Sequence, residues 1–446
     1  MWRNPLDSLR IKLKVLEGEA ERNAFYLYAE VAFASVLSAA ASFNSAYILR
    51  AGGSNTLVGL LSSLPSLLAV FLFIPAARVL EKKKNYLPWV LGSLSLARCG
   101  YLAILILPFF LSKHIPEATV GVLVAMTIPS VFFSTGWSPL LSDVIPPRSR
   151  ATVLAWRSIL SSATAAPLVY LFGRWLDGGT FPSNYQRMYA VGLLGGAISV
   201  ILISRIHIPE TEKEPAPQTQ APKLPWKQAL RAMTQENRYF IRIITNTLVF
   251  NLGAWLVAPL YIILFIRHLG ATDSWIGLNR TLANVGVVIG YWLWRRFIHK
   301  MGEQRALLLA LPLASAYAFM VALVPNLTFI LLAGFLINLI LPGVSLSHSV
   351  IFLNLLPPGK KHVLTAVYST VMNIGAFAGP LIGVALSEHI GILPTLVIGG
   401  ILRFTGAMLF YFRPVQEGMS PRLLIEMLQQ LWAHICKRLR AKQGGQ

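Results

Sequence analysis

HIPETEKEPAPQTQAPKLPW, residues 207–226, divides this 446-residue chain into two parts of similar length. Five prolines stand among Glu, Thr and Gln in this stretch, which has few side chains for an apolar core. Such a composition is typical of an extended or disordered linker. We therefore expect residues 207–242 to connect two folded halves, residues 24–206 and residues 243–413.

On either side of this linker the sequence consists of long apolar runs. Hydrophobic residues make up 55% of the chain and charged residues only 13%, about half the charged share of soluble domains. A transmembrane helix needs about 20 mostly apolar residues to cross roughly 30 Å of hydrocarbon. We therefore predict an all-α polytopic membrane protein with twelve transmembrane helices in two six-helix bundles. The runs lie at about 24–49, 55–77, 86–110, 118–141, 151–173, 188–204, 243–266, 274–294, 306–324, 326–350, 362–387 and 391–412.

The basic residues are distributed unevenly around these runs. With the N-terminus in the cytoplasm, 30 of the 39 Lys and Arg lie on cytoplasmic segments, five on the opposite side and four within runs. The positive-inside rule then predicts an even number of spans with both termini cytoplasmic, in the plasma (cell inner) membrane. The same bias accounts for the net charge of +21, so we expect no nucleic acid as a partner.

Both ends of the chain are predicted to lie at the cytoplasmic membrane surface. Residues 1–23 form an arm of mixed charge that does not resemble a cleavable signal. In the tail, residues 414–446, apolar residues recur at helical spacing from Leu424 to Ile435, and a basic cluster follows them. This pattern is typical of an amphipathic helix on an anionic leaflet, so lipid is an expected partner.

The two halves resemble each other in sequence. Several matching residues occur in the same order in both, which indicates an internal repeat. The matches include Arg50 with Arg267, Gly53 with Gly270, and the Pro-Pro pairs that begin at positions 146 and 357.

Over about residues 24–413, two six-span halves joined by a cytoplasmic linker resemble the major facilitator superfamily of secondary transporters. The basic loop after the second span and the turn between spans four and five are similar to that family's cytoplasmic loops. The resemblance implies alternating access, with these loops as gating latches; for Lys82 the alternative is that it sets topology and contacts lipid. The gating candidates are Arg78, Lys82, Asp143, Arg148, Arg150, Arg295, Arg296, Arg305, Lys360 and Lys361.

Six ionisable side chains fall inside the predicted spans, where a charged group costs about 2.5–3.5 kcal/mol at mid-membrane. Glu30, the only acid, is either a proton carrier or the structural partner of an arginine. The resemblance places Arg98 and Arg403 on peripheral spans, where we expect them to snorkel or to brace helices. It places Arg157 and Arg280 on spans that reach the central cavity.

Uncharged polar and aromatic residues concentrate on the spans that the resemblance assigns to the cavity. Together with two arginines they suit a small polar or anionic solute; the alternative is that Ser, Thr and Asn join helices in lipid, and that the histidine is a packing residue. The substrate-binding candidates are Asn44, Trp137, Arg157, Asn251, Trp255, Arg280, Asn284, Asn338, His348 and Asn373.

The sequence therefore predicts a secondary active transporter, a monomer, that moves a small solute and is proton-coupled if Glu30 carries the proton. The alternative is a non-transporting sensor or receptor of the same fold. A membrane enzyme would need paired carboxylates, a metal cluster or an activated nucleophile at membrane depth, and the sequence offers none. Cys99 and Cys436 form no disulfide framework or metal motif, and we expect no cofactor and no metal.

Overall fold

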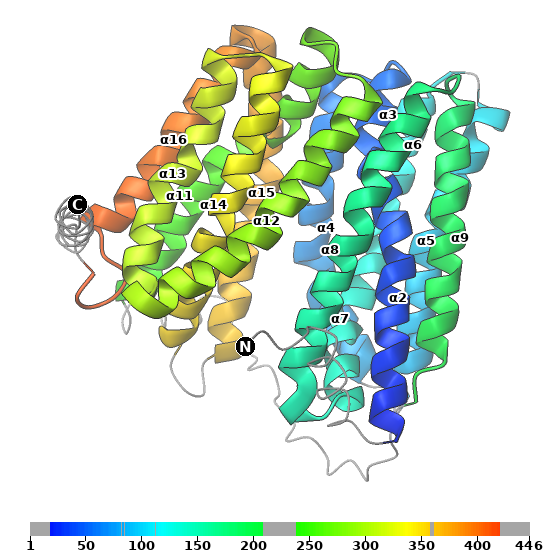
Figure 1. The fold of residues 1–446 in the computed structure, drawn as a ribbon, viewed down its shortest axis with the longest axis horizontal. Helices are drawn as coiled ribbons and strands as arrows, with labels where there is room; N and C mark the ends of the chain where they lie inside the picture. The colour runs from blue at the N-terminus through cyan, green and yellow to red at the C-terminus, as the bar shows by residue number, and fades with distance from the viewer. Residues whose placement is uncertain are drawn as a thin grey trace, which may run out of the picture. The chain divides into compact units, whose positions relative to one another are not determined.

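The computed structural model describes residues 18–81, 83, 85–111, 113–207, 238–356 and 361–419. They form twelve helical rods (Figure 1), some of which are broken into two helices. In chain order the rods are α2–α3 (Glu19–Ala41 and Asn44–Arg50), α4 (Asn55–Glu81), α5 (Leu87–Phe110), α6–α7 (Ile115–Ala125 and Thr127–Val144), α8 (Pro147–Asp177), α9 (Ser183–Ser204), α11 with the π-helix η1 (Arg238–Ile263 and Leu264–His268), α12 (Asp273–Met301), α13 (Glu303–Leu323), α14 (Leu327–Asn354), α15 (Lys361–Ile390) and α16 (Ile392–Phe412).

Each rod overlaps one of the twelve predicted spans, and the all-α polytopic fold is confirmed. Ten of the described rods are long and apolar enough to cross a membrane. The other two, α8 and α12, carry more charge: Arg157 and Arg174 lie on α8, and Asp273 and Arg280 lie on α12. These two rods therefore carry several of the charged groups discussed below.

The boundary between α13 and α14 falls at Pro325-Asn326, where the sequence predicts it. Proline disfavours a helical conformation in the residue before it, and Val324 has φ −128° and ψ 77°. The Asn326 side chain then accepts hydrogen bonds from the backbone N–H of Thr328 at 2.9 Å and of Phe329 at 3.3 Å. Two amides at the start of α14 are thereby satisfied.

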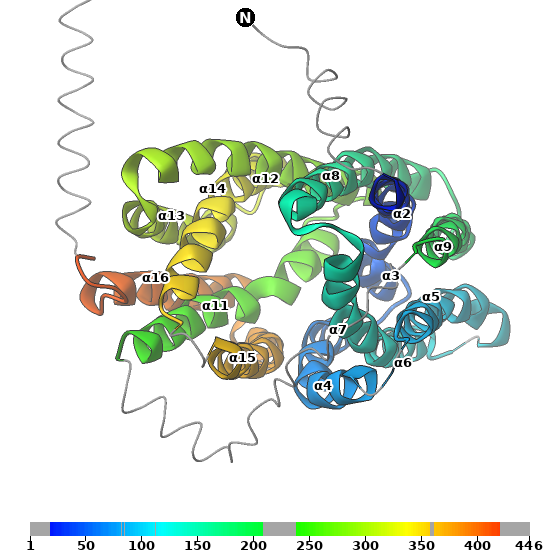
Figure 2. The same cartoon turned by 90° about the horizontal axis from the view of Figure 1, so that it is seen from below.

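Internal contacts divide the chain into two compact units. Unit 1 contains α2 to α9 and also Ile262–Val285, which is the end of α11, η1, the following loop and the first half of α12. Unit 2 contains α11 as far as Tyr261, α12 from Gly286, and α13 to α16. Within unit 1, α2 packs against α8 and α9, and within unit 2, α13 packs against α14 and α16 (Figure 2).

Glycines allow α11 and α16 to approach backbone to backbone in unit 2. A Cβ added at Gly253 would lie 2.4 Å from the backbone nitrogen of Arg403, and one added at Gly406 would lie 2.3 Å from that of Phe250. Small residues at such crossings are a common solution in membranes, where close packing rather than water exclusion joins helices. The crossing places Arg403 directly beside α11.

Residues 1–17, 208–237 and 420–446 lie outside the described residues. They include most of the predicted arm, the linker and the basic amphipathic tail.

Candidate functional site

Glu30 of α2 is the centre of a buried ion cluster in unit 1. The residue is 2% exposed, and Arg157 of α8 donates to its Oε2 at 2.5 Å. Ser199 of α9 donates to Oε1 at 3.0 Å, and Nη2 of Arg98 on α5 lies 3.9 Å from the same oxygen. Arg98 also donates to the carbonyl of Gly196. This one carboxylate therefore joins α5, α8 and α9 to α2.

Glu30 is held in an ion pair with Arg157 and lies within ion-pair distance of Arg98. The pair is not balanced, because two guanidinium groups face one carboxylate. Trp137 of α7 lies against Arg157, whose Cζ is 4.3 Å from the ring centroid. The Nε of Arg157 is buried and has no hydrogen-bond partner among the described residues. The cluster therefore holds one excess positive charge beside an aromatic face.

The Asn44 amide joins three helices of unit 1. It donates to the hydroxyl of Tyr101 on α5 at 3.1 Å and accepts from the hydroxyl of Tyr189 on α9 at 3.0 Å. Both tyrosines are buried and pack with Tyr47 and Tyr185 in an aromatic cluster. Both ends of the Asn44 side chain are thus engaged within the protein, as in the helix-joining alternative.

In unit 2, a cavity of about 310 Å³ lies among α11, α13, α14, α15 and α16. Two predicted residues, Asn251 and His348, line it. The His348 Nε2 lies 2.9 Å from the hydroxyl of Thr247, and its ring is stacked on Phe352 with an interplanar angle of 9°. His348 is therefore held between neighbours, in the manner of a packing residue.

Arg403 lines the same cavity, although its span is predicted to be peripheral. Its Cζ lies 4.6 Å from the ring centroid of Phe250, and its buried Nε has no hydrogen-bond partner among the described residues. No described carboxylate lies within ion-pair distance of it. In the sequence, this position could have been inferred from glycines. They lie near Arg403 on α16 and at Gly253 on α11, and glycines mark close helix crossings.

The other substrate-binding candidates are spread over the two units. Asn338 and Asn373 each donate at 2.8 Å to a carbonyl four residues earlier in their own helices. Trp255 packs against glycines of α15, while Arg280 and Asn284 lie on the first half of α12, in unit 1. Among the described contacts, the structure brings predicted residues together as Arg157 with Trp137 and Glu30, and as Asn251 with His348.

The predicted gating residues are mostly exposed where the structure describes them. Asp143, near the end of α7, accepts a hydrogen bond from the hydroxyl of Tyr86 at 2.7 Å, which ties α7 to the start of α5. The Cζ of Arg296 lies 3.6 Å from the ring centroid of Trp292. Arg78 and Arg295 are exposed and Arg305 is partly exposed. Outside the described part of the chain lie Lys82 and Lys360, and the side chains of Arg148, Arg150 and Lys361.

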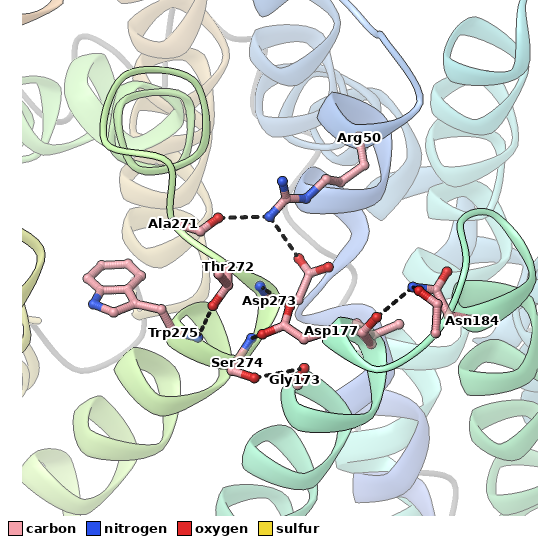
Figure 3. A network of polar contacts seen from close by, with 11 residues as sticks. Arg50, Gly173, Asp177, Asn184, Ala271, Thr272, Asp273, Ser274 and Trp275 are labelled. Carbon is pink, nitrogen blue, oxygen red and sulfur yellow. Dashed lines mark hydrogen bonds and ion pairs between the residues drawn. The ribbon is translucent and has the colours of Figure 1, made fainter.

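A second polar network, which the sequence did not predict, joins residues 271–275 to α3 and α8 within unit 1 (Figure 3). Asp177, at the end of α8, accepts from the backbone N–H of Asp273 at 2.8 Å and of Ser274 at 3.0 Å. Nη2 of Arg50 donates to the carbonyl of Ala271 at 2.7 Å and lies 3.7 Å from Oδ1 of Asp273. Asp177 therefore caps the N-terminus of α12 from a different helix.

The surroundings shift the two carboxyl groups of this network in opposite directions. Burial favours the neutral form of Asp177, but hydrogen bonds from Ser274 and Asp273 outweigh it and hold the pKa of Asp177 below its ordinary value. Burial raises the pKa of Asp273, against the opposing effects of Tyr185 and Arg50. Their sequence signal is weak: both are single acids just beyond the end of a span.

Long apolar helices that pack into bundles, with ion pairs buried among them, are the architecture of a multi-pass membrane protein. Residues 243–441 match the family model described as Major Facilitator Superfamily. This match covers the second part of the chain, which is therefore similar to that superfamily. No curated protein is significantly similar in sequence.

Solved transporters share the fold at low sequence identity. A bacterial homologue of the human lysosomal transporter Spinster, inward-facing and unoccupied, aligns with a TM-score of 0.62 and 14% identity over 89% of this chain and 97% of that one. A variant of the nucleoside transporter NupG aligns with a TM-score of 0.63 and 13% identity, over 87% and 98% respectively. A variant of the E. coli fucose:proton symporter FucP aligns with a TM-score of 0.55 and 14% identity, over 88% and 99%.

Proposed function

We propose that the chain is a secondary active transporter that moves a small polar or anionic organic solute by alternating access between its two halves. We place it in the plasma (cell inner) membrane as a monomer with both termini cytoplasmic, and its basic segments on anionic lipid. The observation that carries the choice of solute is the balance of charges within the bundles. In unit 1 the guanidinium groups of Arg98 and Arg157 face the single carboxylate of Glu30. In unit 2 the half-buried Arg403 has no carboxylate within ion-pair distance among the described residues.

An uncompensated cation inside a bundle is costly because the surroundings have a low dielectric constant. Part of the cost is offset where Arg157 lies against Trp137, since a cation–π contact contributes about 0.5–2 kcal/mol. A solute carrying one negative charge would offset more of it. A solute that is cationic would add to the repulsion, so cations are disfavoured as substrates.

The experiment is uptake of labelled organic anions by proteoliposomes that contain the purified full-length chain. We expect saturable uptake of an anion, little uptake of its uncharged amide, and at least about tenfold slower uptake in Arg157→Gln, because one charge-assisted contact is worth roughly 1.5–3 kcal/mol. Arg174→Gln, at an exposed position on the same helix, is the matched control. Solute binding without net movement would favour the sensor instead.

Glu30→Gln separates the two roles considered for Glu30. If the carboxylate carries a coupling proton, uptake driven by a pH gradient is lost while exchange of solute across the membrane continues. If it only compensates Arg98 and Arg157, gradient-driven uptake and exchange decline together. We assign Glu30 the compensating role, because both of its oxygens are engaged by neighbouring donors.

A further inference from the structure

The cavity of unit 2 combines a cation with polar groups that lack partners. Arg403 lines it without a carboxylate among the described residues. Asn251, Ser345 and Ser349 line it too, and none of these three side chains makes a hydrogen bond within the described part of the chain. Donors that neither pair with one another nor with the backbone are available to a ligand.

Three other substrate-binding candidates of unit 2 do have hydrogen-bond partners within the protein. The amides of Asn338 and Asn373 are engaged by their own helices, and His348 is held by the hydroxyl of Thr247. Asn251 is therefore the predicted asparagine of this unit whose amide has no protein partner among the described residues. It lies on α11, one residue from Phe250, whose ring supports the Arg403 guanidinium.

Part of the remaining wall of the cavity is apolar, beside Thr247, His348 and Tyr368. Leu311 of α13, Leu341 and Val344 of α14 and Phe410 of α16 contribute hydrocarbon surface. At about 310 Å³ the space is at the lower limit for pockets that hold small organic molecules. A bare inorganic ion would leave that apolar surface uncovered. A compact molecule with one charged end would contact both Arg403 and the apolar wall.

We propose that this cavity, inside the C-terminal bundle, is a binding site for a compact organic monocarboxylate. Arg403 takes the carboxylate, with Asn251 and Ser345 as further donors, and the aliphatic and aromatic wall holds the apolar body of the ligand. This inference rests on the proposed function, because it names the class of solute. It also places the binding site of that solute within unit 2. A planar guanidinium suits a carboxylate because two parallel hydrogen bonds can form between them.

The test is thermal unfolding of the purified full-length chain, followed by tryptophan fluorescence, during titration with sodium benzoate. Benzamide serves as the uncharged ligand of the same shape, and sodium chloride as the control for ionic strength. We compare the wild type with Arg403→Met, Arg403→Lys and Arg242→Met. Arg242 lies in the same unit and donates to the carbonyl of Pro414, so it matches Arg403 in type but not in position.

Benzoate should raise the unfolding temperature of the wild type and of Arg242→Met, whereas benzamide and chloride should not. Arg403→Met should raise the apparent Kd by about tenfold or more, and Arg403→Lys should retain part of the effect. Equal stabilisation of Arg403→Met and wild type by benzoate, or equal effects of benzoate and benzamide, would overturn the site. If Arg403→Met fails to fold, Ser345→Phe, which fills the cavity but keeps the arginine, should abolish the benzoate effect.

Binding in detergent requires no transport, so the two proposals fail separately. Stabilisation by benzoate that depends on Arg403, without flux in proteoliposomes, retains the site and rejects transport. Anion uptake that is unchanged in Arg403→Met rejects the site and retains transport.

Discussion

The two bundles surround their buried arginines differently. In unit 1, Glu30 lies within ion-pair distance of two guanidinium groups and joins four helices. The offset in the repeat that takes Arg50 to Arg267 takes Glu30 to Thr247, which carries no charge. Arg403 in unit 2 is left without a carboxylate among the described residues and lines a cavity.

This difference illustrates how one repeat can yield a structural cluster in one copy and a candidate ligand site in the other. A buried cation needs a negative charge nearby, and either a side chain or a ligand can supply it. Where the side chain is present the helices are locked together. Where it is absent, the charge remains available to a solute. Four substitutions test the comparison, in order of the size of effect that we expect.

Glu30→Ala should have the largest effect on stability. Removing the acid leaves two buried guanidinium groups without compensation, and breaking a buried ion pair in this way costs about 3–5 kcal/mol. Thr247→Ala, at the matching position of the second half, removes one neutral hydrogen bond and should cost about 1 kcal/mol. Chemical denaturation in detergent measures both, and costs that agree within error would contradict the comparison.

Gly253→Ala should destabilise unit 2 by about 1–3 kcal/mol, because the new methyl group would overlap the backbone of α16 and force the helices apart. Gly92→Ala on α5 is the control, since nothing lies within 4 Å of a Cβ added there. That change should be neutral or stabilising by up to about 1 kcal/mol, through helix propensity alone. Thermal unfolding measures the stability of both variants. If Gly253→Ala unfolds at the same temperature as the wild type, α11 and α16 are less closely packed than the structure indicates.

Thr247→Glu restores in unit 2 the acid that unit 1 has. The new carboxylate should compensate Arg403 and compete with an anionic ligand, so that the apparent Kd for benzoate rises about tenfold, equivalent to about 1.4 kcal/mol. Thr247→Gln has the same size without the charge and should bind benzoate better than Thr247→Glu. If the two variants bind benzoate equally, the effect is steric and the charge argument is wrong.

Asp177→Ala should have the smallest effect, about 1 kcal/mol, through loss of a helix cap. Because the folded pKa of Asp177 lies below its ordinary value, the ionised carboxylate stabilises the folded state above about pH 4, the unfolded value. That contribution is lost as the pH falls through the folded pKa. Unfolding curves of wild type and variant should therefore differ at pH 7 and converge in strong acid, whereas Asp177→Asn should retain part of the cap at every pH.

The site was predicted less completely than the fold. The sequence identifies Glu30, Arg157 and Trp137 as candidates because ionisable and aromatic groups are unusual at membrane depth. Their mutual contacts depend on how α2, α7 and α8 pack. The resemblance places the span of Arg403 at the periphery, but the order of spans does not give the direction of a side chain on one helix, and Arg403 lines the cavity of unit 2. The Asp177 cap of α12 was missed because it joins residues 96 positions apart.

The sequence by itself determined the number and approximate positions of the helical rods, because apolar length and proline act within one segment. It also determined the repeat and the family resemblance, which rest on the order of residues. Only the tertiary structure decided which buried charges are compensated and which remain available to a ligand. Compensation depends on distances of a few ångströms between helices far apart in the chain, and no local pattern encodes those distances.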